Sequence, residues 1–218
     1  MVLAARRRQL LDELIAASER PERGLALSLD TADPTAPGPV VDDAAAYLEP
    51  HGGLDTVIYA AGTAPLGAIA TTTAAEWHEV LSTNLVGAAM VVAASLTHLT
   101  RPAGVAAPTI VLLSSHSVGD PWPGLVPYGA SKAGLDQLAL GLRAEVPAVR
   151  TICVAVGPTA TSFADGWDQG RAGPYFNDWA ERGYLRHEVL EPDQTAAAIL
   201  AALDDPDAPD DLKVIGEG

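Results

Sequence analysis

The chain has 218 residues, of which 48% are hydrophobic, and its formal net charge is −15 at pH 7. This length favours a single domain, residues 1–218, with a well-filled core. The acidity excludes a surface dominated by Lys and Arg, so we expect neither nucleic acid nor an anionic membrane as a partner. The sequence has no apolar run of membrane-spanning length and no signal-peptide pattern before Arg6, which together predict a cytoplasmic protein.

Strand-like apolar runs alternate with segments whose apolar residues recur at helical spacing. We expect strands at 1–5, 24–29, 54–60, 109–113, 150–156 and 212–215. We expect helices at 10–15, at 41–48, from Thr73 onward, from about Pro127 to 144, and at 193–203. Thr73 and Glu76 have capping-box spacing, so a long helix should begin there and be interrupted at Asn84 and Gly87. The polar and aromatic segment 162–190 is predicted to be a long loop without structure of its own.

This alternation predicts an α/β fold: a doubly wound, Rossmann-like, mostly parallel sheet with helices on both faces. Ligands of such sheets bind beyond the carboxyl ends of the strands. Asp30, Gly62, Ser115 and Gly157 all lie at predicted strand ends. We therefore expect one cleft where these residues meet.

The cysteine and histidine content argues against a metal centre. Cys153 is the only cysteine, so an intrachain disulfide and a thiolate cluster are both excluded, and it is expected to be a buried strand residue. The five histidines lack metal-ligand spacing such as His-Glu-x-x-His. His116 directly follows Ser115 and is the one histidine that we consider as facing a substrate.

Tyr128 and Lys132 are four residues apart at the start of a predicted helix, so their side chains share one face. A nearby ammonium favours the phenolate and would lower the tyrosine pKa from its usual value of about 10. Ser115, thirteen positions before Tyr128, can bring a hydroxyl to the same point. The alternative is a packed tyrosine beside a solvated lysine.

The arrangement of Ser115 with Tyr128-Gly-Ala-Ser-Lys132 resembles the short-chain dehydrogenase/reductase family. The resemblance implies an NAD(P)-dependent oxidoreductase that interconverts a carbonyl and a secondary alcohol. It assigns Tyr128 as the proton donor or acceptor and Ser115 as the group that orients the carbonyl. Lys132 would tune Tyr128 and hold the nicotinamide ribose, and Asn84 would hold a proton-relay water. A locally bonded mid-helix residue is the alternative for Asn84.

The resemblance also implies a set of cofactor contacts. Asp30 would contact the adenine, and Thr161, after the turn at Gly157, would meet the carboxamide. Ala61 and Gly62 would keep the close approach to the cofactor, although the asparagines that precede them in relatives are absent. Arg6 lies where relatives bind the 2′-phosphate of NADP, which favours NADP over NAD. A plain surface arginine is the alternative.

The family's first strand and its Gly-rich phosphate-binding turn do not occur in this chain. In relatives that strand lies at the centre of the sheet, so its absence would leave a gap of roughly 10 Å between unpaired edges. A misassigned or truncated start, a sheet closed up around residues 1–5, and a second chain that supplies the strand all remain open. So do two other functions: a cofactor-free lyase or dehalogenase, and a non-catalytic partner subunit.

Five aromatic residues form a candidate apolar lid over the predicted cleft. They are Trp122, Trp167, Tyr175, Phe176 and Trp179. They predict an apolar substrate lid within 162–190, with a local core as the alternative. The resemblance further implies a homodimer or homotetramer formed through the helices that begin at Thr73 and Tyr128.

Overall fold

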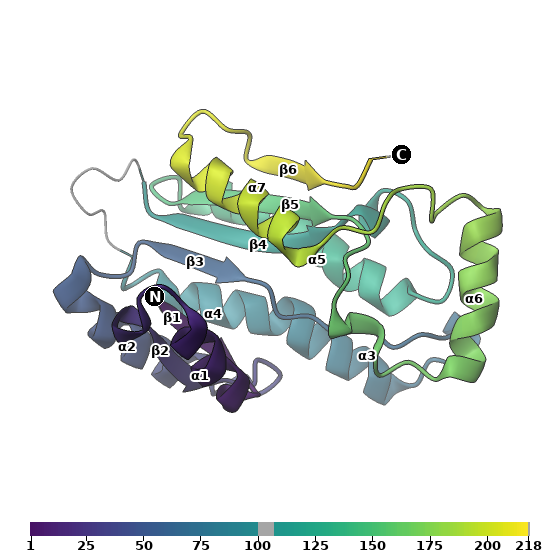
Figure 1. The fold of residues 1–218 in the computed structure, drawn as a ribbon, viewed down its shortest axis with the longest axis horizontal. Coiled ribbons are helices and arrows are strands. Elements are labelled where there is room, and N and C mark those ends of the chain that lie inside the picture. Colours follow the sequence, from purple (N-terminus) through teal and green to yellow (C-terminus); the bar gives the residue numbers. More distant parts are fainter. Residues whose placement is uncertain (100–106, 218) are drawn as a thin grey trace.

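The computed structural model describes residues 1–99 and 107–217. Strands and helices alternate along these residues, as the apolar patterns predict (Figure 1). The strands are β1 (Val2–Ala5), β2 (Leu25–Ser28), β3 (Thr56–Tyr59), β4 (Thr109–Ser115), β5 (Arg150–Val156) and β6 (Asp211–Val214). The α-helices are α1 (Arg8–Ala17), α2 (Pro37–Leu48), α3 (Ala74–Leu81), α4 (Gly87–Ser95), α5 (Val126–Glu145), α6 (Gln169–Glu181) and α7 (Pro192–Asp204). Short helical turns are η1 (Pro21–Arg23), η2 (Glu49–His51), η3 (Ile69–Thr71), η4 (Ser82–Val86), η5 (His116–Val118) and η6 (Ser162–Ala164).

All strand pairs are parallel, and they form two separate sheets. One has the order β3-β4-β5-β6, and the other is the pair β1-β2. Among the described residues no ladder joins β1 to β3, so the possibility that the sheet closes up around residues 1–5 is wrong. The fold class is nevertheless α/β with parallel strands, as predicted.

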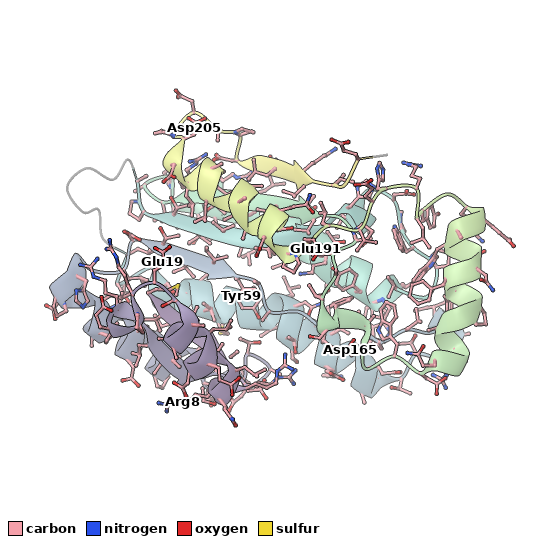
Figure 2. The ribbon with its side chains drawn as sticks, viewed as in Figure 1. Arg8, Glu19, Tyr59, Asp165, Glu191 and Asp205 are labelled. Atoms are coloured by element: carbon pink, nitrogen blue, oxygen red, sulfur yellow. The ribbon has the colours of Figure 1, made fainter. Side chains whose placement is uncertain are left out.

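Packing around Tyr59 explains why the two sheets keep their separation. Tyr59 ends β3 (Figure 2), and its hydroxyl donates a hydrogen bond to the Thr83 carbonyl and is also hydrogen-bonded to Thr31, which follows β2. Gly87 of α4 lies against the same threonine, where a Cβ would come within 2.6 Å of the Thr31 carbonyl oxygen. Helices α2 and α4 also pack together. These contacts hold the β1-β2 pair through side chains and helices instead of through a strand ladder.

Helices cover both faces of the four-stranded sheet. Alternate residues of β4 point to opposite faces, as the pleat requires, so that Ile110 and Leu112 join one core cluster and Val111 joins another. The first cluster packs against α2, α4 and α5, and the second against Ile199 and Ala202 of α7. In Figure 1, α7 accordingly lies in front of β4 and β5, and α5 lies behind them. In the described ranges, none of the helices is both long enough and apolar enough to cross a bilayer.

The predicted capping box and helix interruption are both confirmed. The Thr73 hydroxyl accepts a hydrogen bond from the Glu76 backbone N–H, and the Glu76 carboxylate accepts one from the Thr73 N–H. The helix that follows changes to a π-helix over Ser82–Val86 before it continues as α4. Such π-bulges frequently occur at functional sites, and Asn84 lies at the centre of this one.

The prediction that 162–190 has no structure of its own is wrong, because it contains α6. The Asp168 carboxylate accepts a hydrogen bond from the Arg171 N–H and caps the helix. Two residues, Ala172 and Trp179, are buried on its inner face. Pro174 lies inside the helix, where proline disfavours helical structure, so burial of this face outweighs the local preference.

Candidate active site

A cavity of about 740 Å³ lies beyond the carboxyl ends of β3, β4 and β5. Six of the predicted site residues line it together: Gly62, Ser115, Tyr128, Lys132, Gly157 and Thr161. They come from strand ends and from the first turns of α5, which are far apart in the chain but meet at one edge of a parallel sheet. The predicted convergence at this edge is therefore observed for these six residues.

Tyr128 and Ser115 form the polar centre of this cavity. Ser115 ends β4, and its hydroxyl is hydrogen-bonded to the phenol of Tyr128 in the first turn of α5. The Ser117 hydroxyl lies 2.9 Å from the Ser115 Oγ, and the Ser117 N–H donates to that oxygen over 3.2 Å. Ser117 thereby limits the rotation of the Ser115 hydroxyl, which the sequence motif did not indicate.

The pKa of Tyr128 is raised, contrary to the expectation that Lys132 lowers it. Burial is the larger effect, since it disfavours the charged phenolate, and the hydrogen bond from Ser115 lowers the pKa by less. The Lys132 Nζ lies 5.6 Å from the centroid of the Tyr128 ring. The phenol is therefore protonated near neutral pH, a state suited to donating a proton.

Lys132 is not a solvated surface residue. Its side chain is 5% exposed, and its Nζ donates a hydrogen bond of 2.6 Å to the carbonyl oxygen of Leu113 on β4. Burial lowers the pKa of Lys132 to about 8, while attraction to Cys153 and Asp136 opposes this shift. An ammonium with such a pKa remains mostly charged at pH 7 but can exchange its proton.

Asn84 connects the π-helix to the floor of the site. Its Nδ2 donates to the Thr63 carbonyl over 2.9 Å and to the Ser131 Oγ over 2.9 Å, and its Oδ1 accepts from the Thr63 N–H over 2.8 Å. These contacts are not local to the helix, so the alternative of a locally bonded residue is wrong. Through Asn84, these hydrogen bonds connect the loop after β3 with Ser131 of α5, the residue before Lys132.

Gly62 provides a small hollow between these groups. A Cβ on Gly62 would lie 3.7 Å from both the Asn84 Oδ1 and the Lys132 Nζ, so a side chain here would fill the space next to the ammonium. Ala61 is partly buried against the main core. The residues at this end of the cavity therefore fit the close approach of a flat ligand, as expected for the nicotinamide end of a dinucleotide.

Arg6 and Asp30 do not share this cavity. Both are exposed at the ends of β1 and β2, in the separate two-stranded sheet. The Asp30 carboxylate accepts a hydrogen bond from the Ala32 N–H and closes a local turn. Neither residue lines the cavity around Tyr128, so the expectation that Asp30 meets the other strand-end residues in one cleft is wrong.

The opposite wall of the cavity is aromatic. Trp122, Trp167, Phe176 and Trp179 line it, while Trp122, Trp167 and Trp179 also pack in a cluster with Tyr128 and Tyr175. The aromatic residues thus form both a local core and a cavity wall. His116 lines the cavity too, and its ring meets that of His187 edge-on at 6.2 Å.

Two further residues of the site were not singled out from the sequence. Phe163 of η6 lines the cavity and contacts Tyr128 edge-on, with ring centroids 5.3 Å apart. Ser131 accepts the hydrogen bond from Asn84 and donates its own to the Tyr128 carbonyl over 2.7 Å. Ser131 stands inside the Tyr128–Lys132 motif, which was the available signal, whereas no local pattern distinguishes Phe163.

The shifted pKa values predict how stability changes with pH. Lys132 has a pKa of about 8 in the folded chain and about 10.4 when unfolded, so the unfolded chain binds more protons between these values. Its contribution to the free energy of unfolding should rise by about 1 kcal/mol between pH 8 and pH 9. Chemical denaturation of the wild type and of Lys132→Met across this range measures the effect. Parallel pH profiles for the two proteins would contradict it.

Cys153 supplies the control for this experiment. It is buried in β5 as expected, and burial followed by the nearby Asp136 carboxylate raises its pKa from 9.0 to about 12. Above pH 9 the folded chain therefore binds more protons at Cys153 than the unfolded chain does. The contribution of Cys153 to the free energy of unfolding falls in this range, while the contribution of Lys132 rises. The free energy of unfolding of the wild type should therefore stop rising above pH 9, whereas that of Cys153→Ala should continue to rise towards pH 10.

Comparison with known proteins identifies sequence relatives. The family model for short chain dehydrogenase matches residues 1–172. Sulfoacetaldehyde reductase 2 of Chromohalobacter salexigens is 31% identical over 184 residues, which cover 82% of this chain and 71% of that protein. Dehydrogenase/reductase SDR family member 4 is 30% identical over 123 residues in Oryctolagus cuniculus and 32% identical over 117 residues in Bos taurus. Those matches span only 46% and 41% of the two mammalian proteins.

Solved structures of dehydrogenases also superimpose on nearly the whole of this chain. A short-chain dehydrogenase from Streptomyces avermitilis superimposes with a TM-score of 0.76 and 28% identity, over 98% of this chain and 78% of that one. An alcohol dehydrogenase from Thermococcus sibiricus, solved with 5-hydroxy-NADP, gives a TM-score of 0.77 at 21% identity, over 99% and 85% of the two chains. At that identity the likeness shows the shared fold alone.

Proposed function

Since the chain belongs to the short-chain dehydrogenase family, we propose that it is an NADP-dependent oxidoreductase that interconverts a carbonyl and a secondary alcohol. The observation that carries the proposal is the meeting of Ser115, Tyr128 and Lys132 in one cavity, with Tyr128 hydrogen-bonded to Ser115. A buried phenol and a buried ammonium have little structural reason to share a cavity. Shifted groups of this kind gather at functional sites.

Each side chain has a distinct role in this proposal. The Ser115 hydroxyl donates a hydrogen bond to the substrate carbonyl, held in position by Ser117. Tyr128 gives its proton to the same oxygen during reduction, which its raised pKa supports. Lys132 lies close enough to stabilise the phenolate that remains. Asn84 acts as a positioning residue through Thr63 and Ser131.

The coenzyme supplies or accepts a hydride when it is bound. Lys132 and Tyr128 would hold its nicotinamide ribose, and Gly62, Gly157 and Thr161 would make room for the ring. Ala61 would keep the close approach of the chain to the cofactor, and Asp30 would contact the adenine at the other end. Arg6, exposed at the end of β1, would pair with a 2′-phosphate, because guanidinium groups match phosphate oxygens well.

Coenzyme titration tests both parts of the proposal. Nicotinamide fluorescence should show saturable binding of NADPH, with weaker binding of NADH. Arg6→Ala is expected to weaken NADPH binding by about tenfold and to leave NADH binding unchanged. Arg20→Ala is the control, since Arg20 is also exposed near the two-stranded sheet but lies before β2. Absence of saturable binding for both coenzymes would overturn the proposed activity.

The proposal includes a homodimer or homotetramer and a substrate lid. We place the interface on α3 with α4 and on α5, where Met90 and Leu140 are exposed, and light scattering would measure the assembly. We place the lid on 162–190, because α6 and η6 supply several of the cavity-lining aromatic residues.

A further inference from the structure

The part of the cavity beyond Tyr128 is built almost entirely of apolar surface. Aromatic rings from separate segments of the chain pack against one another and form one continuous wall of this part of the cavity. Ring centroids of Trp122 and Trp179 lie 5.1 Å apart, as do those of Phe176 and Trp179. The aromatic residues of this wall are Trp122, Phe163, Trp167, Phe176 and Trp179, and aliphatic side chains lie beside them.

Formal charge is nearly absent from the cavity. Among its described lining residues, Lys132 alone is a Lys, Arg, Asp or Glu. Its ammonium is bound to the Leu113 carbonyl beneath Tyr128 and faces the catalytic groups instead of the aromatic wall. In the segment 162–190, Arg171, Arg182 and Arg186 are all outside the lining, and Arg182 is paired with Asp178. A carboxylate or sulfonate entering this space would lose its hydration without gaining a guanidinium partner.

Most hydroxyl groups along the cavity are engaged within the protein, whereas the buried Thr195 Oγ1 has no hydrogen-bond partner among the described residues. The Thr159 hydroxyl donates to the Gly157 carbonyl over 3.0 Å, and the Thr161 hydroxyl accepts from the Phe163 N–H over 3.3 Å. Ser117 is bonded to Ser115. Apart from the Thr195 hydroxyl, recognition beyond the reacting carbonyl therefore depends mainly on apolar contact.

From these observations we infer that the substrate is an uncharged carbonyl compound, or the matching alcohol, that carries a bulky aryl or other apolar group. This inference rests on the proposed function, because it assigns the reacting oxygen to Ser115 and Tyr128. The apolar group packs against the aromatic wall, where it replaces water on both surfaces. The net charge of −15 adds a general repulsion of anionic substrates.

A matched pair of ketones tests this inference. 4-Acetylbiphenyl and its 4′-carboxylate differ only by one anionic group at the end away from the ketone. Quenching of tryptophan fluorescence measures binding directly, without turnover. We expect the neutral ketone to bind at least about tenfold more tightly. Equal or tighter binding of the carboxylate would overturn the inferred substrate class.

A positive charge placed in the wall should weaken or remove the preference for the neutral ketone. Phe163 is 37% exposed and contacts Tyr128 by its ring edge, so Phe163→Arg can be tolerated by the fold. This variant should shift the ratio of the two affinities towards the carboxylate by about tenfold. Phe163→Leu should keep the wild-type ratio. Leu14→Arg is the matched charge control, because Leu14 is 61% exposed on α1 and outside the cavity.

The binding and turnover measurements separate this inference from the proposed function. Tight binding of the neutral ketone without NADPH-dependent reduction would support the apolar cavity and contradict the oxidoreductase activity. Reduction of small or anionic ketones in preference to the neutral biaryl would support the activity and overturn the substrate class. An unchanged affinity ratio in Phe163→Arg, with a normal circular dichroism spectrum, would overturn the role of this wall.

Discussion

Tyr128→Phe is expected to lower the turnover of carbonyl reduction by about 10²- to 10⁴-fold, the usual contribution of a positioned acid or base. The change removes the phenolic oxygen and keeps the ring, including its edge contact with Phe163. Folding and ketone binding should therefore remain close to wild type. The rate of NADPH oxidation at saturating ketone measures the effect, with tryptophan quenching as the separate measure of binding.

Tyr47→Phe is the matched control for this experiment. Tyr47 lies on α2, and its hydroxyl makes only a long contact of 3.5 Å to the Glu22 carbonyl. Its loss should leave turnover unchanged. If Tyr128→Phe retained wild-type turnover, another group would have to transfer the proton, and the role assigned to Tyr128 would be wrong.

Trp179→Ala should cause the largest loss of stability among single substitutions in the cavity wall. The indole is 1% exposed, its N–H donates to the Pro123 carbonyl over 2.9 Å, and it contacts the rings of Trp122, Trp167 and Phe176. Truncation of a buried aromatic side chain costs about 3–5 kcal/mol, because a cavity is left behind. Chemical denaturation would measure this loss.

Phe176→Ala is the control that tests whether the loss of stability in Trp179→Ala comes from burial of the side chain or only from its position on α6. Phe176 lies on the same helix and contacts the same indole, but it is 42% exposed. Its truncation removes less buried area and should cost distinctly less. Hydrogen exchange should also show faster opening of 162–190 in Trp179→Ala than in Phe176→Ala. Equal denaturation midpoints for the two variants would mean that the cluster does not stabilise α6 as the packing indicates.

Much of the secondary structure could be predicted from the sequence, because its causes are local. The Thr73 and Glu76 side chains cap α3 through residues three positions apart, and the apolar alternation in β4 follows from the pleat of a strand. The pair Tyr128 and Lys132 is also local, since a helix places residues four apart on one face. Ser115, at the end of a strand, could be added from the parallel-sheet architecture.

The remaining features depend on contacts between distant segments. α6 forms despite Pro174 because Trp179 is buried against residues of other segments, including Trp122. The pKa of Lys132 falls because α5 packs its ammonium under β4, a burial that the motif alone does not specify.

The sequence by itself determined the order of strands and helices, the site motif and the likeness to one family of oxidoreductases. Only the tertiary structure decided that β1 and β2 form a sheet apart from β3 to β6, and that Asn84 bonds to Thr63 and Ser131. It also decided that the cavity is walled by aromatic rings and carries almost no formal charge. The physical reason is that pairing, burial and desolvation depend on which surfaces meet in space, and those surfaces come from segments far apart in the chain.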